Sequence, residues 1–267
     1  MKLCFSTLGC PRWTFKDILS TAKDLNLDGI EIRGVEDQMY APAIDVFSAA
    51  EIEKTKQRLR EAGLEIPVFT SGAALAEPQK AQEAFLEACA YIDLAAAFGS
   101  PYIRVMGTGE PQIALGDFGL AAGLYRQLCV YGQRKGVTPL IETNGMLSAS
   151  GSMRAFLEDA GHANSGVLWD VHHTLRYGGE MPLQTVAALG DQIRHVHVKD
   201  STVVQNQTRY QMMGYGDIPL EDALCLLGTI GYEGFVSLEW VKRWNPDLQE
   251  PGIVFAHFKS YMDGLLS

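Results

Sequence analysis

The residues with the most chemistry to offer lie in short apolar segments. The stretch 194–200 reads RHVHVKD, in which His195, His197 and Lys199 alternate with two valines. Because side chains of a strand alternate between its faces, the two histidines and the lysine share one face and the valines occupy the other. Charged and imidazole side chains are rarely packed this way without a partner, so the stretch predicts a functional strand face.

The same alternation places ionisable side chains on one face of other strand-like segments. In 29–33 the isoleucines fall on the opposite face, and in 102–106 an isoleucine and a valine do so. Burying isolated charges costs several kcal/mol each, so these groups must pair with one another, reach solvent or bind a metal. The side chains assigned to this face are Glu31, Arg104, Glu142, Asp170, His195, His197, Lys199 and Glu239.

Four consecutive strand ends in the second half of the chain offer Glu, Asp, His and Glu. Any one of these carboxylates alone could form a structural ion pair, and a lone histidine is more often a core residue than a ligand. Three carboxylates with one neutral imidazole form a donor set of charge −3, which suits a divalent cation. We expect one ion, with Mn²⁺ the first candidate and Mg²⁺, Co²⁺ or Zn²⁺ as alternatives.

The elements that must position these residues alternate along the chain. Amphipathic helix-like segments at 14–27, 48–64 and 79–99 lie between β-rich runs. The candidate strands are 2–8, 29–33, 65–70, 102–106, 138–143, 166–171, 193–199 and 234–240. Eight strand–helix units predict an α/β fold, a single (β/α)₈ TIM barrel over residues 1–267 with the active site at the carboxyl ends of its strands. An open doubly wound sheet is the alternative, but the phosphate-binding glycine motifs typical of it are absent from the sequence.

The composition limits the classes of partner and the compartment that we expect for this protein. Of 267 residues 47% are hydrophobic, and the formal net charge of −10 argues against a nucleic-acid backbone as the partner. Five cysteines without a C-x-x-C pair predict a reducing compartment. The N-terminal sequence contains no long apolar leader, and no apolar run reaches the length of a membrane span. We therefore expect a cytoplasmic protein that binds neither nucleic acid nor membrane.

The motifs also resemble a known family. The sequence is similar to the xylose isomerase-like TIM-barrel superfamily, and specifically to its sugar-phosphate isomerase/epimerase branch. The resemblance covers essentially the whole chain. The matching motifs are IETNG (141–145), LWDVHHTLRYGGE (168–180), HVHVKD (195–200), GYGDIP (214–219) and SLEW (237–240).

This resemblance implies roles for individual residues. The family's metal ligands fall on Glu142, Asp170, His197 and Glu239, with His195 as a support for His197. His173 would line the site, while His172 would point away if strand geometry continued through it. The substrate-binding candidates are His173, Lys199, Arg104, Arg209 and Asn144; Lys199 could instead form a structural ion pair.

The implied activity is a metal-dependent sugar isomerase or epimerase. Glu142 and Glu239 would act as an acid/base pair on a sugar or related hydroxy-ketone, through a metal-stabilised enediolate. Family members are often homodimers or homotetramers. A dehydratase or lyase of the inosose or dehydroshikimate type is the main alternative. An endonuclease IV-like nuclease fits less well, since six histidines leave too few for its three-zinc cluster. A barrel that binds without turnover would have a broken ligand set.

Overall fold

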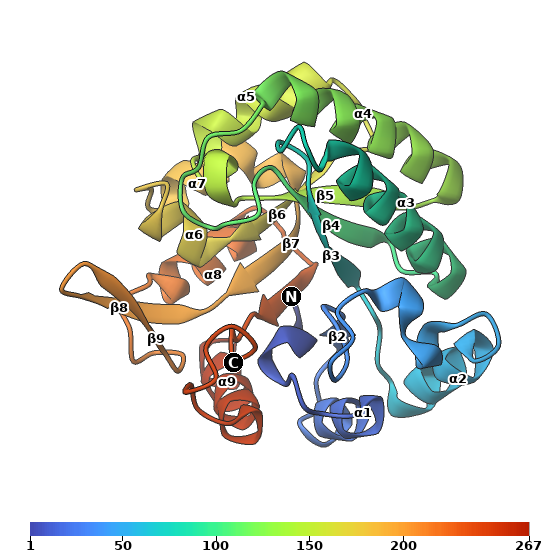
Figure 1. Cartoon of the computed structure of the whole chain (residues 1–267). Helices are drawn as coiled ribbons and strands as arrows, with labels where there is room; N and C mark the ends of the chain where they lie inside the picture. Colours follow the sequence, from blue (N-terminus) through green and yellow to red (C-terminus); the bar gives the residue numbers. More distant parts are fainter. Residues whose placement is uncertain (267) are drawn as a thin grey trace. The chain divides into compact units, whose positions relative to one another are not determined.

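The computed structural model describes residues 1–266 (Figure 1), and the chain forms two compact units. One unit comprises Met1–Pro67 and His197–Ser267, and the other comprises Val68–Val196. The prediction of a single domain over 1–267 stays a prediction, and its last residue lies outside the described part of the chain.

The first unit contains three whole strands of the main sheet. Parallel β1 (Lys2–Ser6) lies between β2 (Gly29–Glu31) and β10 (Phe235–Leu238). An antiparallel hairpin, β8 (Asp200–Val204) with β9 (Gln207–Gln211), projects from this unit (Figure 1). Its helices are α1 (Phe15–Asp24), α2 (Ile52–Ala62), α8 (Leu220–Thr229) and α9 (Pro251–Leu266), with 3₁₀ turns at Thr7–Gly9, Ala41–Ala43 and Asp45–Phe47.

The second unit repeats a strand–helix alternation. Its strands β3 (Val68–Ala74), β4 (Tyr102–Met106), β5 (Thr138–Glu142) and β6 (Gly166–Asp170) pair in parallel, each with the next. Its helices are α3 (Ala81–Phe98), α4 (Phe118–Lys135), α5 (Ser150–Ala160), α6 (Val171–Arg176) and α7 (Pro182–Leu189), with 3₁₀ turns at Gly145–Leu147 and Gly190–Gln192.

Strand β7 (Ile193–Val198) runs from the second unit into the first. The sheet order is β2-β1-β10-β7-β6-β5-β4-β3, so β7 completes a set of eight strands. Eight strands, each followed by helical structure, form a TIM barrel and confirm the predicted fold class. The carboxyl ends of such parallel strands carry the residues that can form a site.

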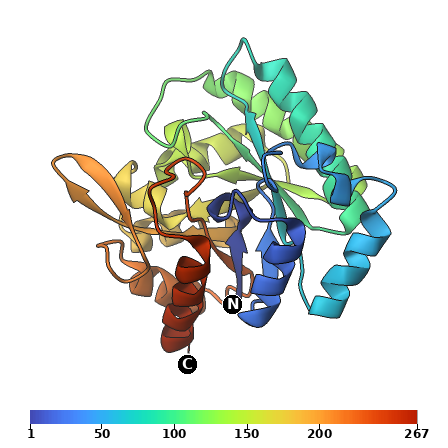
Figure 2. The ribbon, with the colours of Figure 1, turned by 60° about the horizontal axis from the view of Figure 1, so that its bottom comes forward.

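In the first unit, the C-terminal helix α9 lies beside the N-terminal segment that contains β1 (Figure 2), and aromatic side chains pack between them. The ring of Phe255 stacks on Phe5 with 4.0 Å between centroids, and the Trp13 ring meets Phe255 edge-on at 5.6 Å. The rings of Phe5 and Phe255 are fully buried, a packing that supports β1 and therefore its neighbour β2.

A buried tyrosine joins α4 to two strands of the second unit. The hydroxyl of Tyr125 donates to the carbonyl of Pro139 at 2.8 Å and accepts from the amide of Gly166 at 3.1 Å. Burial raises the pKa of this phenol well above its ordinary value, so it stays a donor. The bond bridges the starts of β5 and β6, whose last residues are Glu142 and Asp170.

Two elements differ from the sequence prediction. The third strand covers Val68–Ala74 rather than 65–70, because Pro67 offers no amide hydrogen and only Glu65 forms an isolated bridge, to Gly29. Residues 201–213, where the sequence predicts no strand, contain most of the β8–β9 hairpin, whose turn is made by Gln205 and Asn206 in the left-handed region.

Candidate metal centre

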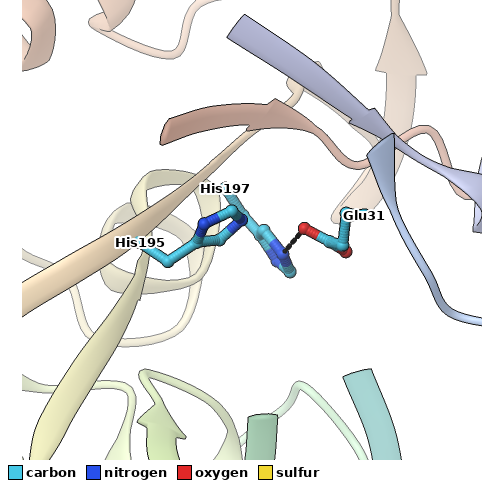
Figure 3. A group of neighbouring side chains, drawn as sticks. All are labelled: Glu31, His195 and His197. Atoms are coloured by element: carbon cyan, nitrogen blue, oxygen red, sulfur yellow. Dashed lines mark hydrogen bonds and ion pairs between the residues drawn. The ribbon is translucent and has the colours of Figure 1, made fainter. Parts of the chain in front are cut away.

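In the first unit, a buried histidine side chain forms a hydrogen bond with a buried carboxylate. Nε2 of His197, in β7, lies 2.8 Å from Oε2 of Glu31 at the end of β2, and both side chains are fully buried (Figure 3). Since an ionised carboxylate only accepts hydrogen bonds, Nε2 carries the proton and donates a hydrogen bond to Glu31. That bond fixes the tautomer and leaves Nδ1 with its lone pair.

The same histidine faces the glutamate that follows β10. Nδ1 of His197 lies 3.4 Å from Oε1 of Glu239. Two atoms bound to one ion at about 2.1 Å each lie roughly 3.0–3.4 Å apart at octahedral or tetrahedral angles. The donor types and this spacing fit a divalent cation, with an Nδ1 nitrogen and a carboxylate oxygen as its ligands.

The other oxygen of Glu239 is held by a lysine. Nζ of Lys199 donates to Oε2 of Glu239 at 2.6 Å, and the lysine is only 1% exposed. A buried ammonium needs such a partner, since it would otherwise lose its hydration uncompensated. Lys199 therefore orients one oxygen of Glu239 while the other faces His197.

A cysteine beside Glu31 is chemically quiet. Burial raises the pKa of the Cys4 thiol well above its ordinary value, and the nearby charge of Glu31 raises it further. A thiol kept neutral in this way is a poor metal ligand and a poor nucleophile. The nitrogen and oxygen donors of the unit are therefore the ones available to a metal.

The second unit contains a matching cluster at the ends of β5 and β6. Nη1 of Arg104 lies 3.0 Å from Oε2 of Glu142, and both side chains are buried. Nδ1 of His173 lies 3.5 Å from Oδ2 of Asp170 and 3.7 Å from Oε1 of Glu142. One carboxylate oxygen of Glu142 thus forms an ion pair with a buried cation, as one oxygen of Glu239 does in the other unit.

Asp170 is oriented by the start of α6. Its Oδ1 accepts the His173 amide at 2.9 Å and caps the helix, while its own amide donates to the hydroxyl of Thr143 at 2.8 Å. Helix geometry also corrects the prediction for His172. Strand alternation does not continue through this residue because α6 begins at Val171, and ligand atoms of Asp170, His172 and His173 all lie within 4.8 Å of one another.

The remaining predicted residues have specific places. The amide of Asn144 donates to the carbonyls of Thr108 at 2.8 Å and Glu110 at 3.2 Å, so it holds the segment after β4. Arg209 lies exposed on β9, opposite Thr202. His195 is fully buried two residues before His197 in β7 (Figure 3). Substrate binding by Asn144 and Arg209 stays a prediction.

One structural carboxylate was missed at the sequence level. Asp200, directly after Lys199, accepts amide hydrogens from Ser201, Gly214, Gly216 and Ile218 at 2.8, 2.9, 2.8 and 3.2 Å. A Cβ on Gly216 would lie 2.0 Å from Oδ1 of Asp200, so only glycine fits there. The sequence signal for this role was the aspartate that ends HVHVKD (195–200), together with the G-x-G motif at 214–216.

A known protein family matches most of this chain. The family model described as "Xylose isomerase-like TIM barrel" matches residues 19–257. The chain belongs to the xylose isomerase-like TIM barrel family. This confirms the resemblance inferred from the sequence motifs. In this family fold, the clusters described above lie at the carboxyl ends of the strands, where TIM-barrel enzymes have their active sites.

A sequence relative of this family member covers a limited stretch. "Putative hydroxypyruvate isomerase" of Streptomyces coelicolor is 34% identical over 92 residues, which is 34% of this chain and 30% of that protein. The match therefore spans less than a third of the relative's length.

Solved structures resemble the fold over nearly its whole length. One is described as a probable 3-DHS dehydratase of Bacillus anthracis (TM-score 0.81, 17% identity, 98% of this chain and 99% of that one). Another is IOLI protein with a zinc atom (0.81, 16%, 99% and 98%), and a third is L-ribulose 3-epimerase (0.79, 17%, 99% and 94%). At these identities the likeness shows the fold.

Within residues 1–266, none of the helices has the length and apolar character needed to span a bilayer.

Proposed function

We propose that this chain is a divalent-metal-dependent isomerase or epimerase of a sugar or related hydroxy-ketone. Glu142, Asp170, His197 and Glu239 would bind one ion, with Mn²⁺ the first candidate and Mg²⁺, Co²⁺ or Zn²⁺ as alternatives. In a TIM barrel the ends of the four strands that carry them belong to the same rim. The observation that carries the proposal is the Glu31–His197 hydrogen bond, which leaves Nδ1 at 3.4 Å from Glu239.

Glu142 and Glu239 would act as the acid/base pair. A bound divalent ion would supply Lewis acidity toward neighbouring oxygens of the substrate. One glutamate removes the proton from the carbon beside the carbonyl, and the released electron pair forms the enediolate. The other glutamate, protonated, returns a proton to the opposite face, which inverts that carbon. Return to the neighbouring carbon instead exchanges aldose and ketose.

Each of these glutamates has one oxygen on a buried cation. Arg104 binds Glu142 at 3.0 Å and Lys199 binds Glu239 at 2.6 Å. These contacts hold each carboxylate in one orientation before substrate arrives, which is the positioning that proton transfer requires. Arg104 and Lys199 would also donate to substrate oxygens, and His173 would donate to a third.

Further parts of the proposal concern the setting of the enzyme. The partner is a small molecule, and assembly would be a homodimer or homotetramer. The chain has five free cysteines, three of them buried, which fits work in the reducing cytoplasm.

Solvent deuterium exchange tests the reaction. The protein with added Mn²⁺ is incubated in D₂O with a panel of ketoses, inososes and hydroxy-keto acids. Deuterium appearing on the carbon next to the carbonyl, together with an inverted or isomerised product, supports the proposal. Release of water with a conjugated enone would identify a dehydratase instead. A metal content near three per chain with cleavage of abasic DNA would identify a nuclease.

A further inference from the structure

Thr143 lies directly after the last residue of β5 and is fully buried. The paired part of β5 and β6 ends with Glu142 opposite Leu168. Beyond it the Thr143 amide still donates to the carbonyl of Leu168 at 3.0 Å, and the amide of Asp170 donates to the Thr143 hydroxyl at 2.8 Å. A side-chain oxygen therefore continues the contact between the two strands past the point where their backbone pairing ends.

Three hydrogen bonds join Thr143, Asp170 and His173 into a closed triangle. Oγ1 of Thr143 accepts the Asp170 amide at 2.8 Å, and Oδ1 of Asp170 accepts the His173 amide at 2.9 Å. The third side runs between Nδ1 of His173 and the carbonyl of Thr143, which lie 3.2 Å apart. Since a carbonyl only accepts, Nδ1 carries the proton and donates a hydrogen bond to it. All three residues are buried, so these bonds form away from bulk water.

The hydroxyl of Thr143 is the part of the triangle that can be removed without altering a proposed site residue. A branched Cβ restricts the rotamers of threonine, so the oxygen that meets the Asp170 amide is held in place. Without the hydroxyl, that buried amide loses this acceptor, which is unfavourable. Asp170 is also the N-cap of α6, so a shift of its backbone would move both its carboxylate and His173 in the first turn.

We propose that Thr143 is a positioning residue of the site. Its hydroxyl holds Asp170 and, through the start of α6, His173 in the orientations that the ion and the substrate require. This rests on the proposed function, in which Asp170 is a metal ligand and His173 binds substrate. Thr143 acts through these two residues, in the way that outer partners of metal ligands do.

Two substitutions separate the hydroxyl from the shape of the side chain. Thr143→Val keeps the branched Cβ and removes the hydroxyl, and we expect it to lower Mn²⁺ affinity and kcat/KM about 10–100-fold each. Thr143→Ser restores the hydroxyl and should return both values close to those of the wild type. Calorimetric titration with Mn²⁺ measures the affinity, and deuterium exchange into the substrate panel measures the turnover.

Thr55→Val in α2 is the matched control. Thr55 is also buried, and its hydroxyl donates to the carbonyl of Val46 at 2.7 Å. This variant therefore loses a buried hydroxyl bond to the backbone, as Thr143→Val does, in a helix that contributes no proposed site residue. We expect Thr55→Val to lower the free energy of unfolding while Mn²⁺ affinity and kcat/KM stay unchanged.

A spectroscopic measurement tests the triangle without metal or substrate. Imidazole ¹⁵N NMR of the metal-free protein distinguishes a protonated from an unprotonated Nδ1, and the His173 signals are those that disappear in His173→Gln. We expect a protonated Nδ1 whose hydrogen exchanges slowly with water in the wild type and in Thr143→Ser. Exchange should be faster in Thr143→Val, because the ring is no longer held on the Thr143 carbonyl.

The outcomes separate the inference from the proposed function. Wild-type Mn²⁺ affinity, kinetics and His173 signals in Thr143→Val would overturn the positioning role and leave the enzyme activity standing. Equal losses of affinity in Thr143→Val and Thr55→Val would also overturn it, since they would reflect stability alone. An unprotonated Nδ1 in the wild type would do the same, and it needs no folded variant. If the wild type neither binds Mn²⁺ nor exchanges deuterium, the proposed function fails and with it the role of Thr143 in turnover, whereas the His173 signals still decide whether the hydroxyl holds the triangle.

Discussion

Glu31 and His197, 166 positions apart in the sequence, share a fully buried hydrogen bond of 2.8 Å. Glu31 ends β2 and His197 lies in β7. A carboxylate on the far nitrogen of a ligand histidine fixes its tautomer and raises its basicity. Glu31 therefore acts on the proposed metal through His197.

Removing this carboxylate should weaken metal binding. We expect Glu31→Ala to lower Mn²⁺ affinity about 10–100-fold, the usual effect of losing such an outer partner. The Mn²⁺ affinity of Glu31→Gln should lie between those of Glu31→Ala and the wild type, because its amide oxygen still accepts a hydrogen bond from Nε2 of His197. Calorimetric titration with Mn²⁺ measures these affinities. Glu53→Gln, at a side chain 76% exposed on α2, is the surface control. Unchanged affinity in Glu31→Ala would show that His197 does not depend on Glu31.

The two proposed acid/base residues should be separable from metal binding. Glu142→Gln and Glu239→Gln are each expected to lower kcat about 10²–10⁴-fold, because an amide cannot take up the proton. Metal affinity should fall less in these variants than in His197→Ala, since the amide oxygen can remain a ligand. Steady-state kinetics and metal titration check both effects. Normal activity in both glutamine variants would exclude the two-glutamate mechanism.

Chelation should affect stability as well as turnover. An ion that binds only the folded chain stabilises it by about 2.7 kcal/mol at 100 times its Kd. Treatment with EDTA should therefore lower Tm and abolish activity, and one equivalent of Mn²⁺ per chain should restore both. The comparison uses His197→Ala, whose Tm should respond much less to added Mn²⁺. A Tm that is indifferent to chelator in the wild type would count against a resident ion.

The base of the hairpin should tolerate no side chain at Gly216. A Cβ there would lie 2.0 Å from Oδ1 of Asp200 and 2.5 Å from the carbonyl of Ser201. Overpacking of this kind costs about 1–3 kcal/mol, so Gly216→Ala should lower the free energy of unfolding by that amount. Gly228→Ala in α8 is the control, because a Cβ there meets no atom within 4 Å and stability should hold or rise slightly. Urea denaturation compares the free energies of unfolding of the two variants. A Gly216→Ala variant as stable as Gly228→Ala would refute the steric argument.

Thiol labelling should follow burial. Burial raises the pKa of Cys129 to about 12 and that of Cys10 further still, so both stay protonated at neutral pH. Cys225 is exposed and should react first with iodoacetamide at pH 8, with half-buried Cys89 slower. Peptide mass spectrometry assigns the labelled positions. Modification of Cys10 before Cys225 in the folded protein would contradict the described burial.

Sequence periodicity was sufficient to select the polar strand faces but not their partners. Alternation placed Glu142, Asp170 and Glu239 on the same kind of face, because that depends only on neighbours in the chain. The Glu31–His197 bond depends on how strands far apart in sequence are aligned, which one sequence does not record. His172 was misplaced for a local reason, since Asp170 caps a helix and ends the strand alternation. The hairpin after Asp200 is absent from the predicted strands because its side chains are largely polar on both faces.

Asp200 has a consequence for how this chain can change. It receives amides from Ser201 at the entry of the hairpin and from Gly214, Gly216 and Ile218 at its exit. The path of the chain on either side is therefore fixed by one carboxylate, whatever lies between. We therefore expect that insertion, deletion or grafting within residues 203–212 would leave Lys199 on Glu239.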